Sequence, residues 1–268
     1  MSRFVSEPRP KILYRYVDLR SAWESLEDGT LAFTPASRFN DPFDVNPAVD
    51  MDLSDEEFEL LWRHTGGTKK MSLPEFVQRM RADIPAAEEE LKQHICDMNN
   101  STFGVACFTE RENDPLMWAH YGERHKGAII GFDAACGIME KARAVDYRKN
   151  RYVLRLGEKF DGTFLRVKSE VWKLEAEWRL VARLDVCEVK LRGDRPIFVH
   201  QVEKDAIVCL KFGCRTRDDF KAALTINLKK WGYGKCKVTS MRLCEKTYEL
   251  HEEPYLLPLE RAALDAEG

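Results

Sequence analysis

Two glutamates separated by a single alanine, Glu175 and Glu177, form the most concentrated chemical feature of this sequence. The alternation of apolar and polar residues predicts a strand over 176–183, which places both glutamates and Arg179 on one face. Residues two apart on a strand lie about 6.5 Å apart, so the two carboxylates can work on one substrate. The pair is our first candidate for catalysis.

The same spacing also fits a structural arrangement. Both glutamates can be solvated, or paired with Arg179 and Lys168, on an exposed face of a sheet. From the spacing alone this is the simpler interpretation, and exposed ion pairs of that kind contribute little to stability. Other parts of the sequence have to decide between the two.

Three further polar segments have a similar double interpretation. Arg15 lies in a predicted strand, 11–17, where its guanidinium can form an ion pair or bind a phosphate or carboxylate. Residues 40–43, Asn-Asp-Pro-Phe, are a typical turn sequence. His120, on a predicted short helix, can carry a proton or form a structural hydrogen bond. None of the three identifies a function alone.

Length and composition restrict the class of protein. The 268 residues are 44% hydrophobic, enough for a complete core, and we expect one domain with an insertion. The formal net charge of -3 gives no overall attraction to nucleic acid, so such binding requires a local patch. The eight scattered cysteines are typical of buried thiols in a reducing compartment. No apolar stretch could span a membrane, and we expect a cytoplasmic protein.

The common motifs of several enzyme classes are absent from the sequence. It contains no Gly-x-Gly-x-x-Gly, no phosphate-loop motif, no Gly-x-Ser-x-Gly and no His-Glu-x-x-His. Rossmann dehydrogenases, P-loop enzymes, serine hydrolases and zincins therefore lose their usual support. What remains is chemistry without a protein nucleophile or a metal.

The hydrophobic pattern predicts an α+β domain over 11–250, with mixed or antiparallel central sheets and flanking helices. The domain opens as strand, helix and strand, and Gly29 suits the end of that helix. A helical insertion is expected at about 54–99. Tails at 1–10 and 251–268 flank the domain.

Capping signals and breaks complete the expected elements. In the insertion, Ser54 and Ser72 resemble N-caps, and Gly66-Gly67 and Pro85 should break the helices. The other predicted elements are strands at 103–109, 127–132, near Ile197, 206–212 and 237–243, a short helix from Asp114-Pro115 to Tyr121, a helix at 167–175, and a helix from Thr216, whose Thr-x-x-Asp219 resembles a capping box.

Seven short motifs occur in a recognisable order along the chain. They are Leu13-Tyr-Arg-Tyr16, Phe33-Thr-Pro-Ala-Ser-Arg-Phe-Asn-Asp-Pro-Phe43, Cys107-Phe-Thr-Glu110, Met117-Trp-Ala-His-Tyr121, Lys126-Gly127, Gly131-Phe132 and Glu175-Ala-Glu-Trp-Arg-Leu180. Together they resemble the bacterial family catalogued as domain of unknown function 2971, over about 11–250. The combination of Asn-Asp-Pro-Phe, Trp-x-His-Tyr and Glu-x-Glu-Trp-Arg is more specific than any single motif.

A more distant resemblance links this pattern to ADP-ribosyltransferases, which implies their fold and NAD as a substrate. In this resemblance Arg15 belongs to the first strand, the segment 118–121 to an aromatic-rich middle, and Glu175 and Glu177 to a late Glu-x-Glu strand. Cleavage of the nicotinamide–ribose bond passes through an oxocarbenium-like state, which a fixed carboxylate can stabilise.

The resemblance also implies a role for each residue. Glu177 would stabilise the oxocarbenium, and Glu175 would align or deprotonate the acceptor. Arg15 would hold phosphates or the ribose side, and Tyr121 would stack on nicotinamide. The residues expected to bind NAD are Arg15, Ser37, Arg38, Asn40, His120 and Tyr121. The acceptor is water or an unidentified protein or nucleic acid, in keeping with a toxin, effector or defence protein.

Two alternatives from other classes remain open. The chain can be a non-catalytic sensor or binding module, in which Asn40, His120, Glu177 and Arg179 form a buried polar network that fixes the fold. It can also be a metal-dependent nucleic-acid enzyme. That enzyme would hold a divalent ion with Asp41, Asp44, Glu175 and Glu177.

Overall fold

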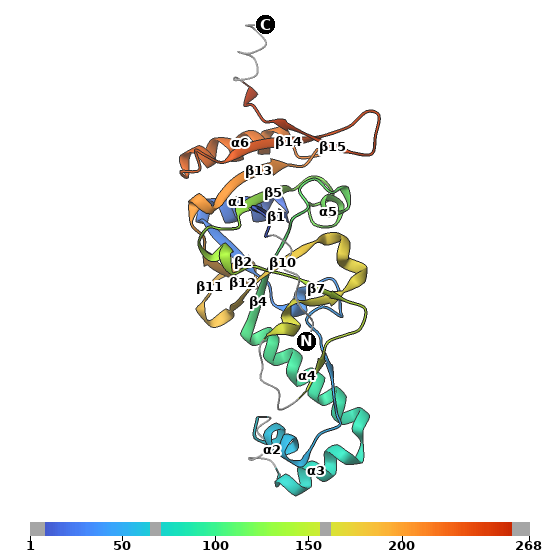
Figure 1. Cartoon of the computed structure of the whole chain (residues 1–268). Coiled ribbons are helices and arrows are strands. Elements are labelled where there is room, and N and C mark those ends of the chain that lie inside the picture. Colours follow the sequence, from blue (N-terminus) through green and yellow to red (C-terminus); the bar gives the residue numbers. More distant parts are fainter. Residues whose placement is uncertain (1–8, 65–70, 156–161, 259–268) are drawn as a thin grey trace.

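A computed structural model describes residues 9–64, 71–155 and 162–258 of the chain. It has a mixed α+β fold, as predicted, built around an eight-stranded sheet (Figure 1). In sheet order the strands are β15 (Leu250–Pro254), β14 (Lys237–Leu243), β13 (Ile207–Phe212), β5 (Ala128–Asp133), β1 (Ile12–Val17), β4 (Phe103–Thr109), β10 (Glu177–Arg183) and β6 (Arg143–Ala144). The sheet is mixed because β13 and β14 pair in parallel, whereas the other neighbours are antiparallel.

The first predicted strand lies inside this sheet, between β5 and β4. Leu13 and Val17 on one face of β1 belong to the main core. Tyr14 and Tyr16 on the other face pack in a second apolar cluster with Trp118. The two faces of the strand therefore belong to different clusters, because successive side chains of a strand point in opposite directions.

A helix and a short strand follow β1, as the sequence predicts. Helix α1 (Leu19–Asp28) starts after Asp18, whose side chain accepts a hydrogen bond from the Ser21 amide, and ends at Gly29 in the left-handed conformation. The next strand belongs to a second sheet, with the order β11 (Glu188–Arg192), β12 (Arg195–Gln201) and β2 (Thr30–Phe33). Helix α6 (Asp218–Lys230) contacts α1 and adds its apolar residues to the same core.

The predicted insertion forms a helical unit with its own core, extending from one end of the sheet (Figure 1). Its helices are α2 (Asp55–His64), α3 (Leu73–Ala82) and α4 (Ile84–Thr102). Ser72 forms the predicted N-cap, completed by a capping box with Glu75. Pro85 lies in the first turn of α4 and therefore starts a helix instead of only breaking one. Gly66 and Gly67 lie outside the described residues.

The segment before β10 differs from the prediction. In place of a helix at 167–175, β9 (Val167–Ser169) pairs in parallel with β7 (Asp146–Arg148), and a 3-10 helix, η5 (Glu170–Glu175), follows. Val171 and Leu174 of η5 remain exposed. An α-helix here would lack an apolar stripe to bury, which is the usual source of helix stability in proteins.

Two expectations near the C-terminus also differ from the structure. Thr216 forms no capping box, because its hydroxyl donates to the carbonyls of Lys126 and Gly127, and α6 begins two residues later. The sheet continues past residue 250, where we expected a tail, because β15 pairs with β14.

The remaining elements are short. Helix α5 (Pro115–His120) begins at its predicted N-cap, Asp114. The others are β3 (Ala48–Val49), β8 (Val153–Leu154), η1 (Ala36–Arg38), η3 (Gly137–Lys141), η4 (Thr163–Arg166), η6 (Leu184–Val186) and η7 (Lys204–Ala206). Within 9–64, 71–155 and 162–258, no helix has the length and apolar character needed to cross a membrane.

Candidate functional site

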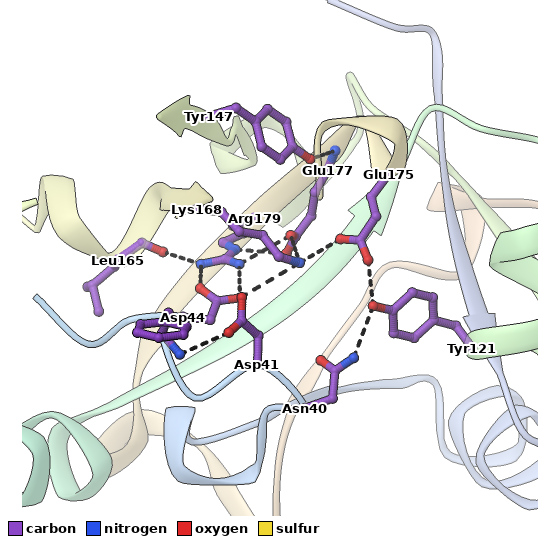
Figure 2. Close-up of polar contacts among 11 residues, drawn as sticks. Asn40, Asp41, Asp44, Tyr121, Tyr147, Leu165, Lys168, Glu175, Glu177 and Arg179 are labelled. Atoms are coloured by element: carbon purple, nitrogen blue, oxygen red, sulfur yellow. Dashed lines mark hydrogen bonds and ion pairs between the residues drawn. The ribbon is translucent and has the colours of Figure 1, made fainter. Parts of the chain in front are cut away.

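Five charged side chains form a buried network where β9, β10 and the loop after η1 meet (Figure 2). Lys168 Nζ donates to Glu175 Oε2 at 2.5 Å and to Glu177 Oε2 at 2.9 Å. Arg179 binds both carboxylate oxygens of Asp44, at 2.8 and 2.6 Å, and both oxygens of Glu177, at 2.7 and 3.1 Å. The glutamates are therefore buried and ion-paired, and the expected pairing on an exposed sheet face is wrong about exposure.

Mutual attraction keeps Glu177, Lys168 and Arg179 ionised despite their burial. Burial alone would raise the pKa of Glu177, but Arg179 and then Lys168 outweigh it and lower that pKa to about 2. Burial would lower the pKa of Lys168, but Glu177 and Glu175 raise it above its usual value. The pKa of Arg179 is raised in the same way, chiefly by Glu177. Around neutral pH, Glu177 is a carboxylate and both cations keep their protons.

A backbone turn, and not strand alternation, brings the two glutamates together. Glu175 ends η5, Glu177 begins β10, and Ala176 between them has φ 44° and ψ 53°, in the left-handed region. Non-glycine residues rarely adopt this region. Thr109 Oγ1 fixes the turn by donating to the Glu175 carbonyl at 2.5 Å. Both carboxylates contact Lys168, but the predicted placement of Glu175 on the strand with Glu177 is wrong.

A cavity of about 390 Å³, here called the first cavity, opens beside this network. Most of the predicted site residues line it, namely Arg15, Arg38, Asn40, His120, Tyr121, Glu175 and Glu177. Ser37 does not, because its backbone amide donates to Asn100 Oδ1 on α4 and the residue is exposed. Residues from β1, η1, β4, α5, η5 and β10 thus meet at one place, over a floor of ion pairs.

Arg15 differs from the other residues that line the first cavity, because one of its buried donors has no partner in the described part of the chain. Its Nη1 is buried, and among the described residues it has no hydrogen-bond partner. The guanidinium carbon lies 5.8 Å from the centre of the Phe108 ring. Burial lowers the pKa of Arg15, with only a small opposing effect of Cys107. A buried donor without an acceptor is costly, and an anionic ligand in the first cavity would satisfy it.

Tyr121 and Asn40 connect the network to the mouth of the cavity. The Tyr121 hydroxyl donates to Glu175 Oε1 at 2.5 Å and accepts from Asn40 Nδ2 at 3.4 Å. Burial and then Glu175 raise the pKa of Tyr121, so its hydroxyl stays protonated and keeps donating. The position of Glu175 is therefore fixed from two sides, by Tyr121 and by Lys168.

The two glutamates differ in the capacity to accept further hydrogen bonds. A carboxylate offers about four lone-pair positions. Glu177 receives two bonds from Arg179 and one from Lys168. Among the described residues, Glu175 receives one bond from Tyr121 and one from Lys168. Glu175, whose side chain is 10% exposed, has room to accept from a ligand, whereas both oxygens of Glu177 are already bound by buried cations.

Other predicted residues have structural contacts. Arg38 Nη1 donates to the Pro196 carbonyl at 2.7 Å. Asp41 Oδ1 accepts from the Phe43 amide, as expected for a turn residue. His120 is exposed, and its ring centre lies 6.2 Å from that of Tyr121. The network of the sensor hypothesis is thus partly present: Glu177 and Arg179 are in it, while His120 lies at the surface.

Sequence reasoning did not identify Lys168, Tyr147 and Cys107 as site residues. Lys168 was considered only as a surface ion-pair partner, yet it is the common partner of both glutamates. Tyr147 accepts from the Glu177 amide at 2.8 Å. Because β7 and β9 are only three residues each, hydrophobic periodicity gave no signal for the pairing that places these side chains.

Three of the four acidic residues of the metal hypothesis, Asp44, Glu175 and Glu177, are paired with protein cations. Asp44 and Glu177 share Arg179, and Lys168 lies between Glu175 and Glu177. Among the described residues, no three metal-binding side chains are grouped so that they could hold an ion. The donor set therefore does not fit a divalent cation, which would compete with two resident positive charges.

Comparisons of the chain with protein-family models, with curated proteins and with solved structures gave no match. The geometry of the site therefore supplies the functional argument.

Proposed function

We propose that the chain binds NAD in the first cavity and cleaves its nicotinamide–ribose bond, transferring ADP-ribose to an acceptor. The observation that carries this proposal is that two carboxylates and Arg15, whose Nη1 has no hydrogen-bond partner among the described residues, line one cavity with aromatic walls. A dinucleotide offers the matching groups: anionic phosphates, ribose hydroxyls and a flat ring. This proposed reaction is the one that the resemblance to ADP-ribosyltransferases implies, and the residues that line the first cavity support it.

In the proposed reaction the C1′–N bond of the ribose breaks and its electron pair leaves with nicotinamide. The positive charge that develops on the ribose is stabilised by a fixed carboxylate. A hydroxyl or amine of the acceptor then bonds to C1′ and gives its proton to water. Arg15 binds a phosphate, which satisfies its buried donor, and the wall aromatics contact the flat rings.

The geometry favours Glu175, and not Glu177, as the carboxylate that meets the ribose. Both oxygens of Glu177 are held by cations, whereas Glu175 has unused lone pairs and faces the cavity. In this proposal Glu177 is a positioning residue: it keeps Lys168 and Arg179 in place, and Lys168 holds Glu175. This reverses the roles that the sequence resemblance implies.

The test is nicotinamide release from NAD by the purified protein, with and without bacterial lysate as a source of acceptor. We expect Glu175→Gln to slow release by at least about 100-fold while the melting temperature stays close to that of the wild type. Glu170→Gln is the matched control, because Glu170 is an exposed glutamate of the same 3-10 helix. It should release nicotinamide at the wild-type rate. A folded wild type that neither releases nicotinamide nor binds NAD contradicts the proposal.

A second candidate is the non-catalytic sensor or binding module. The binding of both Glu177 oxygens by Arg179 and Lys168 favours it, because a well-bonded buried network rigidifies a fold. This alternative expects no NAD binding and a large loss of stability in Glu177→Gln. Wild-type nicotinamide release that depends on Glu175 separates the two candidates.

A further inference from the structure

A second cavity of about 230 Å³ lies next to the first, on the other side of Lys168, which lines both. We call it the basic cavity, because its lining includes Arg148, Lys149, Arg151 and Lys168, and none of the described residues that line it is a carboxylate. The whole chain has a net charge of -3, so this is a local reversal of the overall charge. A local basic patch is what nucleic-acid binding requires in such a chain.

Two of these cations are available at the mouth. Arg148 is paired with Asp146, and Lys168 is used by the buried network. Lys149 is exposed and forms no ion pair with a described residue. Arg151 is also exposed, and among the described residues its Nη2 donates only to the Asn46 carbonyl. Within the part of the chain that the structure describes, neither charge is neutralised by a carboxylate, so both can meet a phosphate.

Aromatic rings alternate with these guanidinium groups. Phe43 is 63% exposed, and the Arg151 guanidinium lies 5.5 Å from its ring centre. The Arg148 guanidinium lies 5.7 Å from the ring centre of Tyr152. Exposure of a phenylalanine ring to water is unfavourable. A nucleotide base could stack on this ring while its phosphate contacts the neighbouring cations.

One loop separates the two cavities. Asp44 lines the first cavity, while Phe43, Val45 and Asn46 line the basic cavity. Val45 has φ 53°, a conformation that costs a β-branched residue energy and persists only where its surroundings enforce it. The strained backbone serves both sites, since it holds Asp44 against Arg179 and leaves Phe43 exposed.

We propose that the basic cavity binds single-stranded nucleic acid; resting on the function proposed above, that strand is the acceptor of ADP-ribose. Bases in a duplex are stacked on each other and cannot lie on Phe43, whereas single-stranded bases can. An acidic peptide would use the same cations but has no flat rings to match Phe43 and Tyr152. The shared wall, Lys168, places the bound strand next to Glu175.

Binding is tested first without NAD, by fluorescence anisotropy of labelled single-stranded DNA and RNA of about 12 nucleotides. We expect Lys149→Ala/Arg151→Ala to weaken binding at least about tenfold and to reduce the salt slope by about 1.4. Phe43→Ala should weaken binding at least about fivefold. The matched controls are Arg217→Ala/Arg242→Ala, two exposed arginines elsewhere, and Tyr248→Ala, a fully exposed aromatic. The controls should bind like the wild type.

Three results overturn the binding proposal. The first is a folded wild type that binds neither oligonucleotide at low salt. The second is an equal loss in the control variants, which would indicate non-specific attraction. The third is binding of an acidic peptide as tight as that of the oligonucleotide and insensitive to Phe43→Ala, which would assign the cavity to a protein segment.

The acceptor role is tested separately, by adding NAD labelled in its ADP-ribose part. Label on the bound oligonucleotide supports the role. Nicotinamide release without such label overturns the acceptor role and leaves binding intact. Binding without any nicotinamide release counts against the proposed enzymatic function and not against the nucleic-acid site.

Discussion

Two buried lysines in this protein have different surroundings. Lys168 lies on β9 at the floor of the first cavity, and all its carboxylate partners, Asp44, Glu175 and Glu177, are themselves buried. Lys211 on β13 is equally buried and packs 5.3 Å from the ring centre of Tyr14. Its partners reach water: the Glu112 side chain is 45% exposed and that of Glu252 is 17% exposed.

The comparison indicates which network belongs to a site and which to the scaffold. The Lys211 partners can turn to solvent if the lysine is lost, so the energetic cost of that loss is limited. Around Lys168 three carboxylates share two cations, which leaves one excess negative charge away from water. Uncompensated buried charge is expensive, and such arrangements are common at functional sites.

Replacing each lysine by methionine should give the largest difference. Lys168→Met leaves three buried carboxylates with Arg179 alone, and we expect it to lower the free energy of unfolding by about 3–5 kcal/mol. Lys211→Met should cost about 1–2 kcal/mol, because Glu112 can rehydrate. Urea denaturation of the two variants measures both values. Equal losses of unfolding free energy in the two variants would show that the solvent exposure of the carboxylate partners does not determine the cost of losing the lysine. That result would contradict the distinction drawn between the two networks.

Protonation of the Lys168 network at low pH should lower the free energy of unfolding by on the order of 3 kcal/mol. The pKa of Glu177 is about 2 in the folded protein, against an ordinary value of 4.5. Its stabilising contribution is therefore complete above about pH 4.5 and is lost as the pH falls toward 2. Stability measured between pH 5 and 2 should decline in the wild type, with a flatter profile in Glu177→Gln. A variant profile parallel to that of the wild type would assign the decline to other carboxyl groups.

The smallest effect should come from the outer edge of the Lys211 network. Glu252 accepts from Lys211 and Lys237, and these contacts lower its pKa although burial alone would raise it. Glu252→Gln keeps the shape and leaves Lys211 paired with Glu112, so we expect a loss below about 1 kcal/mol. Thermal denaturation at neutral pH tests this. A loss as large as that of Lys168→Met would mean that Lys211 also depends on a buried partner.

Much of the fold could be predicted from local patterns. The faces of β1, the end of α1 at Gly29 and the N-caps at Ser72 and Asp114 all follow from side-chain period or capping chemistry. These signals are local, because each depends on residues within a few positions. Thr216 shows the limit: its hydroxyl has partners about 90 residues away, and no local pattern reveals them.

The sequence predicted which residues belong to the candidate site, but not how they are arranged in space. The motif resemblance selected Arg15, Asn40, Tyr121, Glu175 and Glu177, and the structure brings them to one cavity. The burial of Arg179 against Asp44 depends on a contact across 135 residues. The left-handed turn at Ala176 departs from the usual preference of alanine. Tertiary contacts decide both features, so the sequence pattern could not.

The position of β1 between β5 and β4 has a consequence for the nascent chain. This strand is synthesised before both of its partners, which begin at residues 103 and 128. The helical unit α2–α4 lies between β1 and β4 in the sequence. It depends mostly on contacts between neighbouring helices, and such local contacts form with little loss of chain entropy. That unit can assemble on the ribosome while β1 still has no strand to pair with. The charged network cannot close until Arg179 has emerged, so the site is completed only when two thirds of the chain exist.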